Sequence, residues 1–253
     1  MQTAFLWPPK TAVCIQKALG GRNRAENDQP VPGALRTVEV MNSGCQTETE
    51  ITSEAQLREV LGEPRAYVAN KDRQYLHDYD KQWLANSPLC LVATSAADGS
   101  CDVSPKGDPP GFTLVLDDTT IAIPERPGNR RGDGYRNILT NPHVGLVYLI
   151  PGRGDTLRIN GRARLVREAP FFDQMKVKDH RPLLALIVEI EQLFYHCPKA
   201  FLRSHLWQPD SWDPTSVPSK AQIARCLERP DDTLEELERY YGPAYAASLY
   251  QTR

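Results

Sequence analysis

The sequence predicts a mainly β fold with helical decorations, an α+β chain built on an antiparallel sheet or a closed barrel. Short β-rich runs follow one another at hairpin spacing between residues 89 and 167, with few helices between them. Turn sequences such as Ala97-Asp98-Gly99 and Asp117-Asp118 separate successive runs. A further long apolar run, residues 183–194, is predicted to extend the sheet.

Composition places the chain among ordinary globular proteins. Its 253 residues and 28.4 kDa are enough for one domain with a sizeable core. The hydrophobic content is 40% and the charged content 25%. A formal charge of -2 argues against a nucleic-acid partner, which usually requires a strongly basic protein. No run approaches the roughly eighteen apolar residues of a membrane span, so no membrane partner is expected.

The cysteines indicate neither a metal site nor a disulfide framework. None forms a C-x-x-C pair, and the six are widely scattered: Cys14, Cys45, Cys90, Cys101, Cys197 and Cys226. A chain of this length with a proper core does not depend on disulfides. We therefore expect reduced thiols, no bound metal and a cytoplasmic location.

The first 50 residues differ in composition and pattern from the rest of the chain. They contain Pro8-Pro9 and Gly20-Gly21, show no sustained period, and have no acidic residue before Glu26. We predict a poorly ordered extension. Organelle targeting through residues 1–25 is the alternative, because transit peptides are also poor in acidic residues.

Helices are predicted before and after the strands. Ser53, Gln56 and Gly62 provide start and stop signals for a helix over 51–62, and a second helix is predicted over 72–85, with Tyr75 and Trp83 on one side. Further helices are predicted over 135–139, 170–179 and 197–206 and from Thr233 onward. The predicted strands are 89–95, 100–104, 112–116, 120–123, 143–150, 156–167 and 183–194.

Two stretches carry candidate binding chemistry. Between Ile123 and Asn137, the six residues 126–131 contain three arginines and Asn129, with glycines among and after them. Guanidinium groups form bidentate hydrogen bonds to phosphate, so an anion site and a solvated turn are equally consistent with this stretch. One hairpin earlier, a strand runs into Ser104-Pro105-Lys106-Gly107, which taken alone is typical of an edge strand leaving a sheet.

The order of these motifs, together with the runs 93–99, 137–142 and 157–163, resembles the pyridoxamine 5′-phosphate oxidase-like split-barrel flavoproteins. The resemblance is closest to a subfamily described as probable FMN-dependent enzymes. It covers residues 53–207, including His196 to Ala200. An ordered string of motifs is more specific than any one of them.

The resemblance implies an antiparallel split β-barrel of the FMN-binding type, with FMN at the interface of a homodimer. It implies a flavin-binding domain, which together with its N-terminal helices is predicted over 51–215. The helical spacing after Thr233 predicts a helical tail over 216–253. In the implied site, the strand residues Val103, Ser104, Pro105 and Lys106 follow the isoalloxazine ring, and Ile123 and Pro124 back the ring and the ribityl chain. The phosphate is held by Asn129, Arg130 and Arg131. Arg158 is added by the second subunit, and Trp207 covers the ring.

Several neighbouring residues also have ordinary structural interpretations. Arg126 is interpreted as a surface partner of Glu125 or Asp133, and His196 and Lys199 as a packed side chain and a helix cap. The chain lacks the terminal Arg-x-His segment of true pyridoxamine phosphate oxidases, so FMN binding carries over better than vitamin oxidation does.

The sequence therefore predicts an FMN-dependent oxidoreductase that carries out a two-electron step on an unidentified small molecule. NAD(P)H is a candidate electron donor, and no catalytic residue is assigned. The alternatives are a split-barrel reductase that uses a deazaflavin or haem, and a non-catalytic flavin-binding protein.

Overall fold

The computed structural model describes residues 49–250. The predicted extension over residues 1–50, with its targeting alternative over 1–25, therefore lies almost entirely outside the described residues. The described residues form two compact units. One comprises residues 49–212 and 247–250, and the other residues 213–246.

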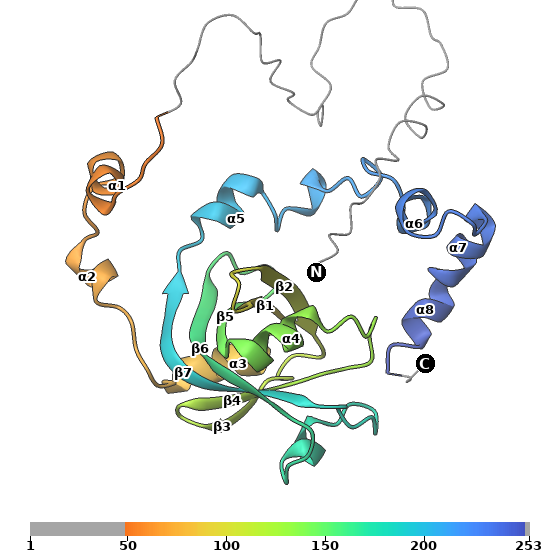
Figure 1. Cartoon of the computed structure of the whole chain (residues 1–253), viewed down its shortest axis with the longest axis horizontal. Helices are drawn as coiled ribbons and strands as arrows, with labels where there is room; N and C mark the ends of the chain where they lie inside the picture. The colour runs from red at the N-terminus through yellow and green to blue at the C-terminus, as the bar shows by residue number, and fades with distance from the viewer. Residues whose placement is uncertain (1–48, 251–253) are drawn as a thin grey trace, which may run out of the picture. The chain divides into compact units, whose positions relative to one another are not determined.

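Within the described residues, seven strands form one antiparallel sheet in the order β2-β1-β5-β6-β7-β4-β3 (Figure 1). The strands are β1 (Leu89–Ser95), β2 (Cys101–Gly107), β3 (Leu114–Asp117), β4 (Thr120–Pro124), β5 (His143–Leu149), β6 (Thr156–Val166) and β7 (Ala185–His196). The sheet is not closed, and β2 and β3 are its edge strands. The architecture is an antiparallel split barrel with helices, which confirms the predicted fold class.

Alternating burial explains why these segments form strands with one face toward a common core. In β1, Cys90, Val92 and Thr94 are buried, while their neighbours are partly exposed. The fully buried ring of Tyr148 in β5 lies in the same core cluster as Leu193 of β7. Burial of this kind stabilises a protein by about 25 cal/mol per Å² of apolar surface.

Strand β2 continues further than predicted. The expected strand ended at Ser104, whereas β2 pairs with β1 as far as Gly107. Pro105 lacks a backbone N–H, but on an edge strand that position can face away from the partner strand. The proline is therefore accommodated within β2.

The first helix is confirmed, but it does not pack into the core. Helix α1 (Glu54–Leu61) begins after Ser53, whose side chain accepts from the Gln56 N–H, and it ends at Gly62. None of its residues is buried, and Val60 remains 69% exposed. A one-turn helix, α2 (Ala66–Ala69), follows and was not predicted.

The predicted helix over 72–85 begins later than expected. Helix α3 (Asp78–Asn86) starts after His77, which forms a reciprocal capping box with Asp80. Upstream, Arg73 exchanges backbone hydrogen bonds with Leu193 of β7, so this segment is extended against the sheet. Trp83 is buried as predicted, but Tyr75 is 57% exposed, contrary to the expected packed face.

The predicted helix over 170–179 is wrong. Only Phe172–Met175 forms a short 3-10 turn, η1, whose two end residues pack in a second apolar cluster. Lys178 and Asp179 have φ angles of 47° and 65°, in the left-handed region that ends regular helix. Local backbone conformation therefore prevents the segment from continuing as a helix.

After β7 come α5 (Lys199–Ser204) and the 3-10 turn η2 (Pro209–Ser211). Helix α6 (Lys220–Leu227), which was not predicted separately, and α7 (Leu234–Tyr240) pack through Ala224 and Leu237. Thr233 caps α7 as expected, and α8 (Pro243–Ala247) follows. No helix in residues 49–250 is long and apolar enough to cross a membrane.

A bulge at Asn160 and Gly161 shifts the register between β6 and β7. A Cβ at Gly161 would overlap the backbone carbonyl of Glu189. We expect Gly161→Ala to lower the free energy of unfolding by roughly 1–3 kcal/mol, the usual cost of forcing atoms into a packed site. Chemical denaturation of the purified variant measures this change.

Gly145→Ala is the matched control, because Gly145 lies opposite Asn160 on β5. Its added Cβ would make an ordinary contact of 3.5 Å with Asn160 Oδ1. Equal stability losses in the two variants would contradict the proposed role of close packing at Gly161.

Candidate functional site

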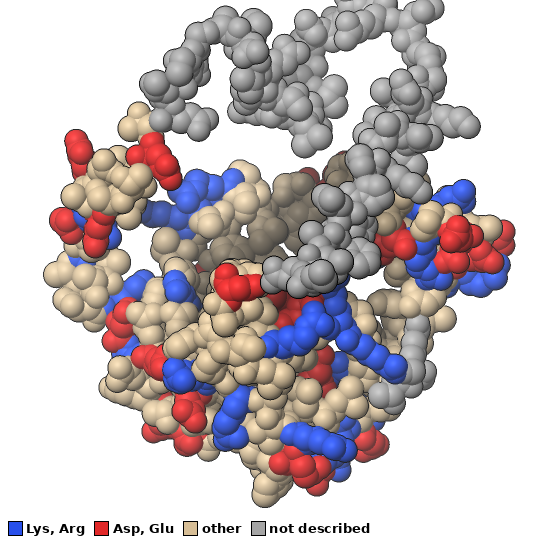
Figure 2. Space-filling view, viewed as in Figure 1, with Lys and Arg blue, Asp and Glu red and all other residues tan. Residues whose placement is uncertain are grey.

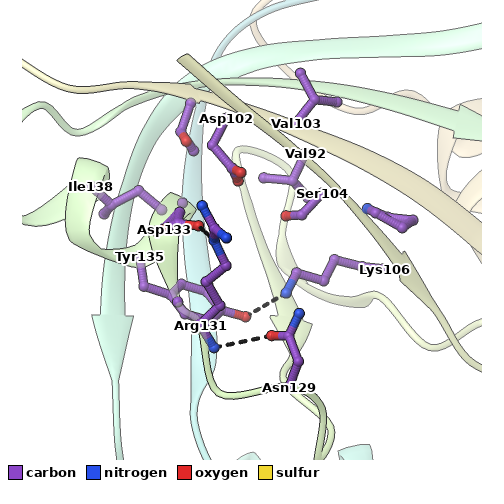
Figure 3. Close-up of a pocket in the computed structure, with 14 residues that line it drawn as sticks. Val92, Asp102, Val103, Ser104, Lys106, Asn129, Arg131, Asp133, Tyr135 and Ile138 are labelled. Atoms are coloured by element: carbon purple, nitrogen blue, oxygen red, sulfur yellow. Dashed lines mark hydrogen bonds and ion pairs between the residues drawn. The ribbon is translucent and has the colours of Figure 1, made fainter. Parts of the chain in front are cut away.

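A cavity of about 340 Å³ lies between β2 and the beginning of α4 (Asp133–Thr140), as Figure 3 shows. Its walls are residues 102–106 of β2, the loop around Asn129, and residues 131–135. Val92 and Ile138 provide apolar lining. Its volume is within the range typical of small-molecule sites.

Strand β2 provides one wall with an unusual combination of side chains. Asp102, Ser104 and Lys106 are half-buried, whereas Val103 and Pro105 are exposed. Because β2 is an edge strand, alternate backbone N–H and C=O groups have no neighbouring strand to pair with. The wall therefore offers both backbone polar groups and a lysine to a ligand.

The start of α4 provides the facing wall. Gly132, the N-cap, has a φ of 67°, and no side chain caps the helix. The side chain of Asn129 instead accepts from the Arg131 N–H at 3.0 Å. A Cβ at Gly134 would lie 2.9 Å from Asp102 Oδ2, so the glycine permits close packing of α4 on β2. Uncapped first-turn N–H groups carry partial positive charge and suit an anion.

The arginines beside the cavity differ in whether they form ion pairs with neighbouring side chains. Asp133 accepts from both Arg131 and Arg136, and the hydrogen bond to Asp133 raises the pKa of Arg131. Arg130 is exposed and has a φ of 60°. On the face shown in Figure 2, basic and acidic side chains are interspersed over the barrel. The positive charge at this site is therefore a local feature.

Lys106 joins β2 to two other elements. Its ammonium donates to Glu125 Oε2 at 2.7 Å and to the Tyr135 hydroxyl at 2.8 Å, and it lies 4.6 Å from the Tyr135 ring centre. The Tyr135 hydroxyl also donates to Glu125. Burial, reinforced by the Glu125 carboxylate, raises the pKa of Tyr135. A protonated phenol and an ammonium are thus held together at the cavity wall.

Sequence reasoning missed Glu125 and Tyr135 as members of this cluster. Glu125 directly follows β4, and Tyr135 lies in the first turn of α4. The one available signal was that each residue adjoins a stretch already singled out. Nothing in the local pattern indicated that β2 would bring Lys106 to both of them.

The structure brings together one part of the predicted site. Val103, Ser104, Pro105, Lys106, Asn129 and Arg131 all line the cavity. Ile123 and Pro124 are buried in β4 and do not line it, although they precede Glu125. Arg130 adjoins the lining residues but is not one of them.

Two predicted site residues lie elsewhere in the chain. Arg158 donates to Asn160 Oδ1 at 3.2 Å, and its guanidinium lies 5.3 Å from the centre of the Phe194 ring. Trp207 donates its indole N–H to the Arg153 carbonyl at 2.6 Å and stacks on Phe201. Neither residue lines the cavity of its own chain, so their predicted contacts with a cofactor remain predictions.

Arg126 does not pair with Glu125 or Asp133, as the sequence analysis had expected. It forms an ion pair with Asp108 at 2.5 Å and donates to the carbonyls of Met175 and His180. These contacts are possible because the 167–184 segment folds back beside β4. Arg126 therefore has a structural role on the barrel.

His196 and Lys199, to which the sequence analysis gave structural interpretations, lie at and just after the end of β7. His196 is partly buried, and burial, with Arg158 and Lys71 nearby, lowers its pKa. Lys199 is the first residue of α5, which has no side-chain cap. Within the described residues, no group of three His, Cys, Asp or Glu side chains is placed to hold a metal ion.

The segment that holds the strands and the cavity was compared with known proteins. Residues 76–197 match the family model described as pyridoxamine 5′-phosphate oxidase. The matched segment, just under half of the chain, is similar to domains of the pyridoxamine 5′-phosphate oxidase family. The matched segment contains all seven strands together with α3 and α4, and therefore both walls of the cavity.

Solved structures similar to this chain include a putative pyridoxamine 5′-phosphate oxidase from Lactobacillus delbrueckii, with 25% identity and a TM-score of 0.39 over 48% of this chain and 95% of that one. HupZ from Group A Streptococcus has 22% identity and a TM-score of 0.39, over 47% and 93%. HutZ from Vibrio cholerae, described as a haem storage protein, has 17% identity and a TM-score of 0.33, over 47% and 93%. The comparison with curated proteins found no match.

The raised pKa of Tyr135 leads to a pH-dependence prediction. Above the ordinary tyrosine pKa of 10.0, the unfolded chain loses this proton while the folded chain retains it. The unfolded state then binds fewer protons, so the free energy of unfolding contributed by Tyr135 declines as the pH rises above 10. We expect Tyr135→Phe to be about 1 kcal/mol less stable at pH 7 and to lose less stability above pH 10.

Urea denaturation between pH 7 and 11 measures both effects. The control is Tyr67→Phe, which removes a hydroxyl from a residue that is 70% exposed. A Tyr135→Phe profile parallel to that of the wild type above pH 10 would show that Tyr135 is not held protonated by its surroundings.

Proposed function

We propose that this chain is an FMN-dependent oxidoreductase that acts on a small molecule and works as a homodimer. The observation that carries the proposal is the meeting of β2 and the arginine-rich start of α4 around one cavity. The cavity residues lie within the segment that matches a family named for an oxidase, which supports the proposal. The proposal concerns redox chemistry of this kind and not oxidation of the vitamin itself.

The cavity residues suit the two ends of FMN differently. At the helix end, the uncapped N–H groups of α4, the Asn129 amide and the guanidiniums of Arg130 and Arg131 are donors of the kind that bind a phosphate dianion. Along β2, unpaired edge-strand groups can hydrogen-bond the polar rim of a flat ring. Val92 and Ile138 contribute apolar surface nearby.

When bound, FMN supplies the two-electron hydride chemistry, and the protein supplies orientation and electrostatics. In this proposal, Asn129, Arg130 and Arg131 bind the phosphate, and β2 orients the ring. Lys106, held by Glu125 and Tyr135, keeps a positive charge at the cavity wall. NAD(P)H is the proposed electron donor.

Arg158 and Trp207 fit the proposal through a second subunit. They do not line the cavity of their own chain, but both are partly exposed on the barrel unit. In a homodimer, Arg158 and Trp207 of one protomer would complete the site of its partner. Each of the two sites would then require both chains.

The phosphate assignment is tested by replacing Arg130 and Arg131 together with alanine. We expect the variant to fold but to bind FMN about 100-fold more weakly, because each charge-assisted hydrogen bond contributes roughly 1.5 kcal/mol or more. The absorption spectrum of the purified protein and titration of the apoprotein with FMN measure this change.

The control, Arg225→Ala with Arg239→Ala, removes the same charge from exposed positions on α6 and α7. An Arg130/Arg131 double variant that retains as much FMN as the wild type, measured by its absorption, would refute the phosphate assignment. A deazaflavin or haem spectrum from the wild-type protein would replace FMN with that cofactor.

Mixed dimers test whether two chains share each site. Arg158→Ala alone and the Arg130/Arg131 double variant alone should each retain little FMN. Refolding the two variants together should restore binding at one of the two sites in each mixed dimer, because the undamaged halves then meet. Light scattering of the mixture gives the dimer mass, and absorbance gives the FMN content.

Recovery of no FMN in verified mixed dimers would show that each site is built from one chain. A monomeric wild-type protein with full FMN content would exclude the shared site while leaving the FMN assignment intact.

A further inference from the structure

A second cavity of about 560 Å³ lies on the same barrel, away from the first. It is formed by one face of α3, the turn between β5 and β6, and the end of β7. The two cavities share no lining residue. The second cavity therefore needs its own explanation.

The α3 wall presents aromatic rings and amides in one row. Tyr79, Gln82, Trp83 and Asn86 are spaced as i, i+3, i+4 and i+7, and all four line the cavity. Tyr79 is 71% exposed, and its ring contacts the tilted ring of His77 at 5.0 Å between centroids. Asn86 donates Nδ2 to the Gln82 backbone carbonyl at 2.8 Å, so its amide is fixed and its oxygen is left for a ligand.

Trp83 provides the observation that points to a ligand. The residue is only 8% exposed, and its indole nitrogen is the one buried side-chain polar atom among residues 49–250 that has no hydrogen-bond partner. An indole N–H can only donate, and an unpaired buried donor is costly for a folded protein. None of the described residues accepts from this nitrogen, so an acceptor from outside the chain, a water or a ligand, would stabilise it.

The opposite wall carries one positive and one negative side chain, which pair with each other. Arg153 forms a bidentate pair with Asp155, at 2.9 and 2.7 Å. The Arg153 guanidinium also lies 5.0 Å from the Trp83 ring centre, and its carbonyl accepts from Trp207. These contacts fix the turn at the mouth of the cavity. No uncompensated charge remains among the lining residues to favour an anion or a cation.

We propose that this second cavity binds a neutral planar nitrogen heterocycle, the chemistry of a nucleobase. Exposed aromatic rings stack on bases, and glutamine and asparagine amides read the donor and acceptor pattern of a base edge. A ring nitrogen or carbonyl of the base accepts from Trp83. The base can belong to a free nucleoside or to a dinucleotide, and the proposal does not depend on the cofactor of the first cavity.

Calorimetric titration of the purified full-length protein with adenosine tests this proposal. We expect saturable binding to the wild type, weakened about tenfold in Tyr79→Ala through lost stacking. Trp83→Phe should weaken binding by a similar factor, because one hydrogen bond is lost. Tyr79 is exposed, so Tyr79→Ala tests the proposal even if the Trp83 variant fails to fold.

Matched controls separate this cavity from other surfaces. Tyr75→Ala removes a tyrosine that is 57% exposed and does not line the cavity, and it should leave adenosine binding unchanged. The Arg130/Arg131 double variant should also bind adenosine normally. Absence of saturable binding to the wild type, or binding lost in the arginine variant but kept in Tyr79→Ala, would overturn the proposal.

Two further probes define the ligand. Benzoate is planar but anionic, and we expect it to bind more weakly than adenosine; tighter benzoate binding would overturn the neutral-base assignment. Binding of NAD⁺ that is tighter than that of adenosine, and still sensitive to Tyr79→Ala, assigns the base to a dinucleotide. Equal or weaker binding of NAD⁺ assigns it to a nucleoside.

Discussion

The contacts of Lys106 with Glu125 and Tyr135 hold three separate elements around the first cavity. The ammonium lies on β2, the carboxylate follows β4, and the phenol lies at the start of α4. Because all three groups are partly buried, each needs the hydrogen bonds of the other two. The position of α4 against the edge strand, and with it the opening of the uncapped helix end, depends on this cluster.

The close packing of α4 on β2 depends equally on two glycines, which have no side chain. Gly134 lacks the Cβ that would press on Asp102, and Gly132 adopts a left-handed conformation that most residues avoid. Two glycines beside the arginines therefore do more than loosen a loop. They allow a helix end and a strand edge to approach closely enough to line one cavity.

The regular part of the fold could be predicted from sequence because its signals are local. Short β-rich runs separated by turn residues predicted strands such as β1 correctly, and Ser53 and Thr233 marked true helix starts. The failures have long-range or backbone causes. Arg73 pairs with Leu193, 120 positions away in the chain, which delays α3, and positive φ angles at Lys178 and Asp179 stop the helix expected there.

Some residues of the candidate site could likewise be identified from local sequence signals, and others could not. Ser104, Lys106, Asn129 and Arg131 could be singled out because each belongs to an ordered string of motifs. Glu125 and Tyr135 could not, because their significance arises only when strands distant in sequence come together. The unpaired nitrogen of Trp83 is a property of three-dimensional packing, and a buried tryptophan on a helix gives no sign of it in the sequence.

Strand β2 has a consequence for how this protein behaves at high concentration. A strand edge left open for a ligand is also open to the edge of another molecule, and Val103 is 63% exposed beside it. Pro105 lacks the backbone N–H that a continuous ladder of hydrogen bonds would need there. The same short strand thus keeps its backbone accessible to a small molecule while resisting the self-association that begins many aggregates.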